Sequence, residues 1–194
     1  MLQRICVFCG SSSGTGETYL QAAREVGRLL CERDIEIVYG GGKVGLMGAV
    51  ADACLAAGGR VTGVIPQLLV DKEVAHRGLT ELRVVQTMHE RKALMADLSD
   101  AFLALPGGYG TWDELCEVLT WSQIGIHRKA NALLNVNGYY DPLLAMMDRA
   151  RSEGFLLDIH SELLLTDTDP ARLLARLEAY VPPVVDKWMD RTNR

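Results

Sequence analysis

The stretch Pro106-Gly107-Gly108-Tyr109-Gly110-Thr111 combines residue types suited to binding an anion. It follows an apolar run at residues 101–105 that fits a buried strand, and it precedes Leu115, Val118 and Leu119, which recur at helical spacing. Glycines let the backbone approach a ligand closely, and the N–H groups at the start of a helix attract negative charge. We therefore predict that this strand-to-helix turn binds a phosphate.

Thr111 and Glu114 form a Thr-x-x-Glu pattern at the start of the helix that follows. Such a pattern usually marks a capping box, in which the Thr111 hydroxyl caps the helix and the Glu114 side chain completes the box. The alternative interpretation is chemical, because a carboxylate one turn from a phosphate site is normally unfavourable there. The residues alone leave both interpretations open.

Arg91 and Lys92 stand together at the start of another predicted helix. The helix dipole disfavours cations at this end unless an anion lies nearby. We interpret Arg91 as a functional residue on this ground. For Lys92 a solvated surface position would be ordinary.

The glycines Gly40-x-Gly42-x-x-Gly45 match the dinucleotide-binding fingerprint. They follow the second predicted strand, however, and the third strand ends in Val64-Ile65-Pro66, without the acidic residue that would bind a ribose. No Gly-Lys-Ser/Thr follows, so the stretch does not fit a P-loop either. We favour a tight turn with close packing of helix on strand.

The composition limits the class of protein. A chain of 194 residues with net charge -5 and a pI near 5.4 fits one domain and argues against nucleic-acid or acidic-membrane partners. No apolar run reaches the ~18 residues of a membrane span, and we expect a cytoplasmic protein. The cysteines are scattered and the histidines isolated, so we expect no disulfide framework, metal site or cofactor.

Strand-like and helix-like stretches alternate along the chain, which predicts a Rossmann-like α/β fold with a doubly wound parallel sheet. The predicted strands lie at residues 4–8, 35–39, 61–65, 82–85, 101–105, 130–136 and 163–165. We expect the sheet order 3-2-1-4-5-6, one domain over residues 1–181, and a C-terminal tail over residues 182–194. This topology brings the turns after strands one, two, four and five to one crevice.

Several motifs together resemble those of the LONELY GUY (LOG) family of cytokinin riboside 5′-monophosphate phosphoribohydrolases. The paired motifs are Met88-x-x-Arg91-Lys92 and Pro106-Gly107-Gly108-x-Gly110-Thr111-x-x-Glu114. Cys9-Gly10-Ser11-Ser12 and Gly40-Gly41-Gly42-x-x-Gly45-Leu46-Met47-Gly48 support them. The resemblance spans residues 5–180. Asp113 stands where the family commonly has Glu.

The resemblance implies a homodimer that hydrolyses the N-glycosidic bond of a purine nucleoside 5′-monophosphate to free base and ribose 5-phosphate. It implies catalytic roles for Arg91 and Glu114, and substrate contacts from Glu73, Lys92, Gly107, Gly108, Tyr109, Gly110, Thr111 and Thr120. Family members have been labelled lysine decarboxylases, a function that this chain, without a recognisable pyridoxal-phosphate lysine, does not support.

The residue types allow a mechanism. Glu114 can stabilise an oxocarbenium-like ribosyl cation and orient or deprotonate the attacking water. A guanidinium holds its proton too tightly to act as an acid near neutral pH, so we assign Arg91 to charge stabilisation and positioning. The group that protonates the leaving base stays open, with Glu73 and Asp97 as candidates. A general AMP nucleosidase and a non-catalytic nucleotide-binding protein are the alternative functions.

Overall fold

The strands of the chain form one parallel sheet in the computed structural model, which describes residues 2–72 and 74–183. The sheet has seven strands in the order β4-β3-β2-β1-β5-β6-β7, and every neighbouring pair is parallel. The strands are β1 (Arg4–Phe8), β2 (Glu36–Tyr39), β3 (Val61–Pro66), β4 (Glu81–Val85), β5 (Ala101–Ala104), β6 (Ala130–Leu134) and β7 (Leu164–Asp167). The Rossmann-like single-domain prediction is confirmed.

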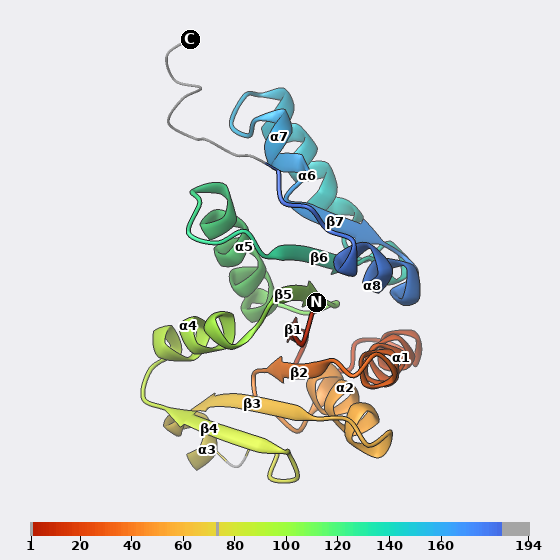
Figure 1. Ribbon diagram of the computed structural model, residues 1–194, viewed down its shortest axis with the longest axis vertical. Helices are drawn as coiled ribbons and strands as arrows, with labels where there is room; N and C mark the ends of the chain where they lie inside the picture. The colour runs from red at the N-terminus through yellow and green to blue at the C-terminus, as the bar shows by residue number, and fades with distance from the viewer. Residues whose placement is uncertain (1, 73, 184–194) are drawn as a thin grey trace.

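Helices cover both faces of the sheet, as Figure 1 shows. They are α1 (Thr18–Glu32), α2 (Gly45–Ala56), α3 (Gln67–Asp71), α4 (Met88–Leu98), α5 (Tyr109–Gln123), α6 (Asp141–Ser152), α7 (Asp158–Ser161) and α8 (Pro170–Glu178), with a short 3-10 helix η1 (Val136–Gly138). Buried side chains of α1, α2 and α8 form one core cluster with the sheet, and those of α4 and α5 form the other.

Strand β1 shows why the central strands read as continuous apolar runs. Ile5 and Val7 belong to the cluster on one face, whereas Cys6 and Phe8 belong to the cluster on the other. Successive side chains of a strand point to opposite faces, so a strand covered by helices on both sides needs apolar residues at every position.

The position of β4 differs from the prediction. We expected the fourth strand beside the first, but β4 pairs with β3 at the edge of the sheet, and β5 pairs with β1. The physical reason is burial: β4 carries Glu81 and Arg83 and is partly exposed, whereas all four residues of β5 are buried. A strand with charged side chains fits an edge, where only part of its surface is covered.

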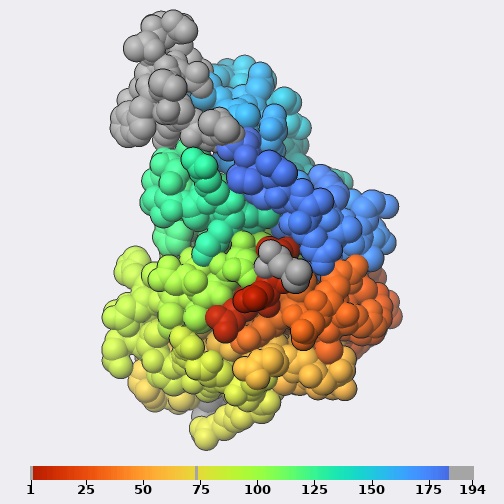
Figure 2. All heavy atoms as spheres, in the orientation of Figure 1, coloured from red at the N-terminus to blue at the C-terminus, as the bar shows by residue number. Residues whose placement is uncertain are grey.

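The sheet reverses its direction of winding between β1 and β5, which is the switch point of the fold. In Figure 2 the red-to-yellow and green-to-blue parts of the chain meet across the middle of the molecule. The two turns that follow β1 and β5 lie in direct contact, since the Gly10 N–H donates to the Pro106 carbonyl at 3.0 Å. The fold thus places the serine turn after β1 beside the turn that we predicted to bind a phosphate.

Other elements match the prediction closely. The unpredicted α7 has only four residues, too few for a periodic signal.

Most of the expected tail, residues 184–194, lies outside the described part of the chain. Within the described residues, no helix is long and apolar enough to cross a membrane.

Candidate active site

A cavity of about 300 Å³ lies at the switch point. One wall is the turn after β1, with Gly10, the serines Ser11–Ser13 and Gly14, and another is the turn after β5, with Pro106, Gly107 and Gly108. Tyr19 of α1, Leu46 of α2 and Tyr139 close the remaining sides. Two polar, glycine-containing turns from distant parts of the sequence therefore border one cavity, as the strand-to-turn pattern predicted.

Helix α5 starts earlier than the capping-box interpretation requires. Its N-cap is Gly108, no side chain in the described part of the chain caps it, and the first helical bond runs from the Trp112 N–H to the Gly108 carbonyl at 3.0 Å. Thr111 is therefore a residue of the first turn, and the predicted cap of Thr111 with Glu114 is wrong. The N–H groups of the first turn, uncapped by any side chain, are free to bind an anion.

Glu114 pairs with Arg91 instead. The Arg91 Nη1 donates to the Glu114 Oε1 at 2.5 Å, and both side chains are only 9% exposed. The Arg91 Nε donates to the Val64 carbonyl at 3.2 Å, which fixes the plane of the guanidinium. Helix α4 starts beside the edge strand β4 and packs on β1, β2 and β3, so it brings Arg91 to the centre of the sheet despite the unexpected strand order.

Gly40 provides the space that Arg91 occupies. A Cβ atom at Gly40 would lie 2.0 Å from the Arg91 Nη2, far inside van der Waals contact. Gly45, which has φ +61°, approaches Ser11 so closely that a Cβ would lie 2.3 Å from its carbonyl carbon. These two glycines of the fingerprint match therefore permit close packing, as we predicted, and Gly40 also clears room for a charged side chain.

Burial dominates the electrostatics of the pair. It raises the pKa of Glu114 above the ordinary 4.5, and the Arg91 charge and hydrogen bond offset the shift only in part. Cys9, which precedes the cavity residue Gly10, is buried, and burial followed by the negative charge of Glu114 raises the pKa of its thiol as well. Burial and the nearby negative charge therefore both favour the neutral thiol at Cys9.

The Lys92 side chain, which follows Arg91 on α4, is 12% exposed and also reaches the start of α5. Its Nζ lies 3.0 Å from the Asp113 Oδ2 and 3.1 Å from the Glu117 Oε1. Burial lowers the pKa of Lys92, but the hydrogen bonds to Asp113 and Glu117 outweigh it and raise the pKa above its ordinary value. Lys92 therefore ties α4 to the first turns of α5 and borders Glu114, but it does not line the cavity.

The remaining predicted site residues divide into three groups. Gly107, Gly108, Gly110 and Thr111 lie at the turn and in the first turn of α5, where Tyr109 is 86% exposed. Thr120 lies ~13 Å beyond Thr111 along α5, at a rise of ~1.5 Å per residue. It lines a separate apolar groove of about 200 Å³ that α6 and α7 also border. Glu73 lies outside the described residues.

Asp97, the other candidate for protonating the leaving base, is exposed near the end of α4. Two residues were not among the predicted site residues: Gly40, which packs against Arg91, and Tyr139, which lines the cavity. Gly40 carried a recognisable signal in its fingerprint match, but its steric role depends on Arg91. Tyr139 follows the predicted sixth strand, and only its place beside Gly107 connects it with the site.

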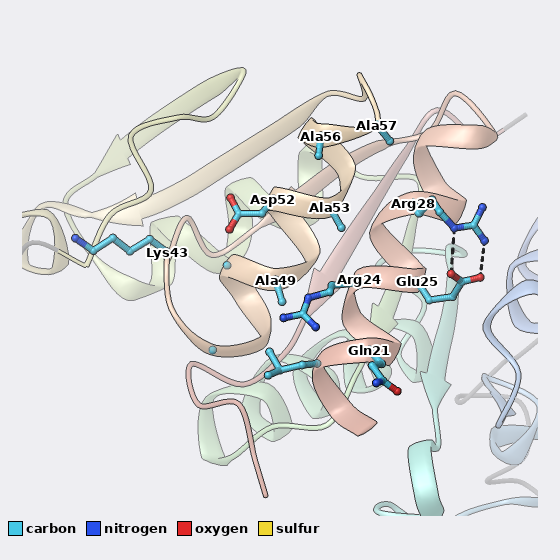
Figure 3. Close-up of a pocket in the computed structure, with 13 residues that line it drawn as sticks. Gln21, Arg24, Glu25, Arg28, Lys43, Ala49, Asp52, Ala53, Ala56 and Ala57 are labelled. Carbon is cyan, nitrogen blue, oxygen red and sulfur yellow. Dashed lines mark hydrogen bonds and ion pairs between the residues drawn. The ribbon is translucent and has the colours of Figure 1, made fainter. Parts of the chain in front are cut away.

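A larger depression, of about 820 Å³, lies between α1 and α2 (Figure 3). Figure 3 shows Ala49, Ala53 and Ala56 on one helix, while the other contributes charged side chains, among them Glu25 and Arg28, which pair with each other at 2.6 Å. Of the described residues that line it, none belongs to the predicted site. The small side chains explain the depression as a shallow groove between closely packed helices.

Known proteins resemble the chain over most of its length. The family model described as "Possible lysine decarboxylase" matches residues 47–177. A protein of Oryza sativa subsp. japonica named "Probable cytokinin riboside 5'-monophosphate phosphoribohydrolase LOGL9" is 53% identical over 180 residues, which are 93% of this chain and 79% of that protein. The Arabidopsis thaliana "Cytokinin riboside 5'-monophosphate phosphoribohydrolase LOG2" is 50% identical over 93% of this chain and 84% of its own.

Among solved structures, the molybdenum cofactor binding protein from Rippkaea orientalis superposes with a TM-score of 0.70 at 19% identity, covering 92% of this chain and 97% of that one. At this identity the likeness supports the fold alone. The match to the family model and the identity to the plant proteins carry the assignment of family: the chain belongs to the LOG family.

Proposed function

We propose that the protein hydrolyses the N-glycosidic bond of cytokinin riboside 5′-monophosphates, releasing the free base and ribose 5-phosphate. The observation that carries the proposal is the buried carboxylate of Glu114, which Arg91 orients one turn from a helix N-terminus that borders a cavity. The names of the plant relatives support the reaction and the substrate class.

The 5′-phosphate binds where the two turns meet. Backbone N–H groups of Gly108 to Thr111 and the hydroxyls of Ser11–Ser13 supply hydrogen-bond donors, and the helix dipole adds positive potential. The phosphate then fixes the ribose so that C1′ faces Glu114. Holding the reacting carbon near a catalytic group in this way supplies a large part of the rate of many enzymes.

The chemistry takes place at C1′. The bond between C1′ and the base nitrogen breaks with its electron pair leaving on the base, and positive charge develops on the ribose. The Glu114 carboxylate stabilises this charge and accepts a proton from the water that attacks C1′. Arg91 favours the ionised form of the carboxylate and orients it, and Lys92 fixes the helix that carries it through Asp113 and Glu117.

We also propose that two chains form a homodimer through the face that includes α6. Helix α6 has no buried side chain within the described part of the chain, and its Met146 is 65% exposed. Phe155, in the turn after α6, is 84% exposed. An apolar face of this kind is typical of an interface. A second copy would also give Thr120, which is remote from the cavity of its own chain, a place near bound substrate.

Incubation with purified protein and chromatography of the products tests the reaction. The substrates are AMP, N6-isopentenyl AMP, the two matching nucleosides and lysine. We expect free base from the monophosphates but not from the nucleosides, and faster release of the N6-substituted base than of adenine. Preference for AMP would instead support a general AMP nucleosidase. Tight nucleotide binding with no released base would support a non-catalytic binding protein, and cadaverine from lysine would support a decarboxylase.

A further inference from the structure

Two adjacent tyrosines follow η1 and reach the turn that precedes α5. The Tyr140 hydroxyl donates to the Leu105 carbonyl at 2.7 Å, and the Tyr139 hydroxyl donates to the Gly107 carbonyl at 2.5 Å. Between them, the Pro106 carbonyl accepts from the Gly10 N–H at 3.0 Å. Every carbonyl of the segment from Leu105 to Gly107 is therefore held by a donor from another part of the chain.

The chain conformation after β6 presents these tyrosines. Asn137 has φ 53° and Gly138 has φ 68°, so two successive residues lie in the left-handed region and turn the chain back toward β5. Buried Asn135 then fixes the turn, because its Oδ1 accepts from the Tyr140 N–H at 2.8 Å and its Nδ2 donates to Asp141 at 2.7 Å. The direction of both phenol rings is thus set by backbone geometry.

Tyr139 touches both walls of the cavity. Its ring packs edge-on against Tyr19, with centroids 5.9 Å apart, and Tyr19 in turn packs on Gly14, where a Cβ would lie 2.7 Å from the Tyr19 ring. Its hydroxyl holds Gly107 of the opposite wall. Tyr139 therefore connects the serine turn after β1 with the glycine turn after β5.

A planar trans peptide fixes what this bond does. The carbonyl of one residue and the N–H of the next point in opposite directions, so a bond to the Gly107 carbonyl also sets the direction of the Gly108 N–H. Gly108 is the N-cap of α5, and as a glycine its backbone can adopt more conformations than that of a residue with a side chain. Without the bond, the peptide between Gly107 and Gly108 would be free to rotate.

We propose that Tyr139 is a positioning residue for phosphate binding: its hydroxyl orients the Gly107–Gly108 peptide so that the N–H groups at the start of α5 converge on the phosphate. The inference rests on the proposed function only in placing the phosphate at this turn. Tyr140 makes an equivalent bond two residues earlier, to Leu105 just after β5, and serves the fold.

Substitution of each tyrosine by phenylalanine separates the two roles, because each variant loses only one hydroxyl. Ribose 5-phosphate is the probe, and its dissociation constant is measured by calorimetry, with melting curves for stability. We expect Tyr139→Phe to weaken binding about tenfold, the effect of one lost hydrogen bond. We expect Tyr140→Phe to melt at lower temperature and to bind within about twofold of the unmodified protein.

Three results would overturn the inference: Tyr139→Phe binding as tightly as the unmodified protein, equal weakening in both variants, or no binding of ribose 5-phosphate to the unmodified protein. A failed hydrolysis assay would remove the proposed reaction but leave this binding test intact. If Tyr139→Phe does not fold, amide NMR of the unmodified protein decides. The Gly108 amide signal must then shift on addition of ribose 5-phosphate, and an unmoved signal refutes the assignment.

Discussion

Two Thr-x-x-Glu tetrapeptides begin helices in this chain, and they fold differently. At residues 87–90 the Glu90 N–H donates to the Thr87 Oγ1 at 3.1 Å, and the Glu90 carboxylate accepts from the Thr87 N–H at 3.3 Å, a complete capping box. At residues 111–114 neither bond forms, and the Glu114 carboxylate binds Arg91.

The difference arises from the residues before each threonine. Gln86 precedes Thr87 and cannot cap a helix well, so Thr87 becomes the N-cap of α4. Before Thr111 stand Gly108 and Gly110, and Gly108 takes an extended conformation that starts α5 three residues earlier. The Thr111 hydroxyl then packs where a side chain on Gly107 would otherwise lie, at 2.1 Å from its hypothetical Cβ.

The comparison teaches that a capping box is a local default that a nearby charge can replace. Glu90 is exposed, and its carboxylate accepts from the backbone N–H groups of Gln86 and Thr87 at the start of the helix. The Glu114 side chain is 9% exposed and binds a buried guanidinium. A charge-assisted bond between buried groups is stronger than a cap at the surface. It also leaves the N–H groups at the start of α5 available for a ligand.

The largest expected difference between the two tetrapeptides comes from replacing the glutamate of each with glutamine. Glu114→Gln removes the charge that we propose stabilises the ribosyl cation, and we expect turnover to fall by about two orders of magnitude with nucleotide binding kept. Glu90→Gln is the matched control, because glutamine can complete a capping box and should leave turnover within about twofold. Product chromatography and calorimetry measure the two quantities. Normal turnover in Glu114→Gln would remove Glu114 from the mechanism.

The pH dependence of the reaction tests the burial of Glu114. Burial raises the pKa of this carboxyl above 4.5. At pH values below that pKa, kcat/KM should therefore fall about tenfold per pH unit, and this acidic limb of the pH profile should lie above pH 4.5. In the same window the folded chain holds a proton that the unfolded chain has released, so the contribution of Glu114 to the free energy of unfolding decreases as pH rises. A pH–rate profile, with circular dichroism as the control for folding, measures the limb. A limb at or below pH 4.5 contradicts the expectation.

Gly40→Ala tests the space that Arg91 needs to reach Glu114. The new Cβ would lie 2.0 Å from the Arg91 Nη2, so the guanidinium must move, and we expect turnover to fall about tenfold. Gly78→Ala is the control, since its Cβ would meet only the His76 ring, at 3.2 Å. Equal activity of the two variants would show that the position of the guanidinium is not critical.

The smallest effect is expected at the capping box itself. Thr87→Ala removes the N-cap oxygen of α4 and should lower the free energy of unfolding by about 1 kcal/mol, whereas Thr87→Ser should keep most of it. Urea unfolding measures both values. If serine and alanine destabilise equally, the methyl group of Thr87, rather than its hydroxyl, supports the helix.

Much of the fold was readable from local patterns. Apolar runs bounded by turn residues predicted the ends of every strand to within two residues. The reason is that a strand of a parallel sheet buried on both faces needs apolar residues at successive positions. The glycine turn after β5, the helix that follows and the nearness of Arg91 to that turn were likewise expected from residue types and motifs, whereas the ion pair of Arg91 with Glu114 was not.

The position of β4 could not be read in this way, because a parallel strand can pair with either edge until the burial of all strands is compared. The start of α5 was missed because the Thr-x-x-Glu pattern at Thr111 is a genuine local signal for a helix cap. In the structure Gly108 starts the helix three residues earlier, and Arg91, distant in sequence, binds the Glu114 carboxylate.

The sequence by itself thus determined the alternation of strands and helices, the glycine-rich turns and the charged residues available for chemistry, since each depends on neighbours within a few positions. Tertiary structure decided which carboxylate meets a guanidinium, which glycine makes room for it and which tyrosine holds the glycine turn before α5. These depend on contacts between residues far apart in the chain, and the packing of the whole sheet sets their geometry.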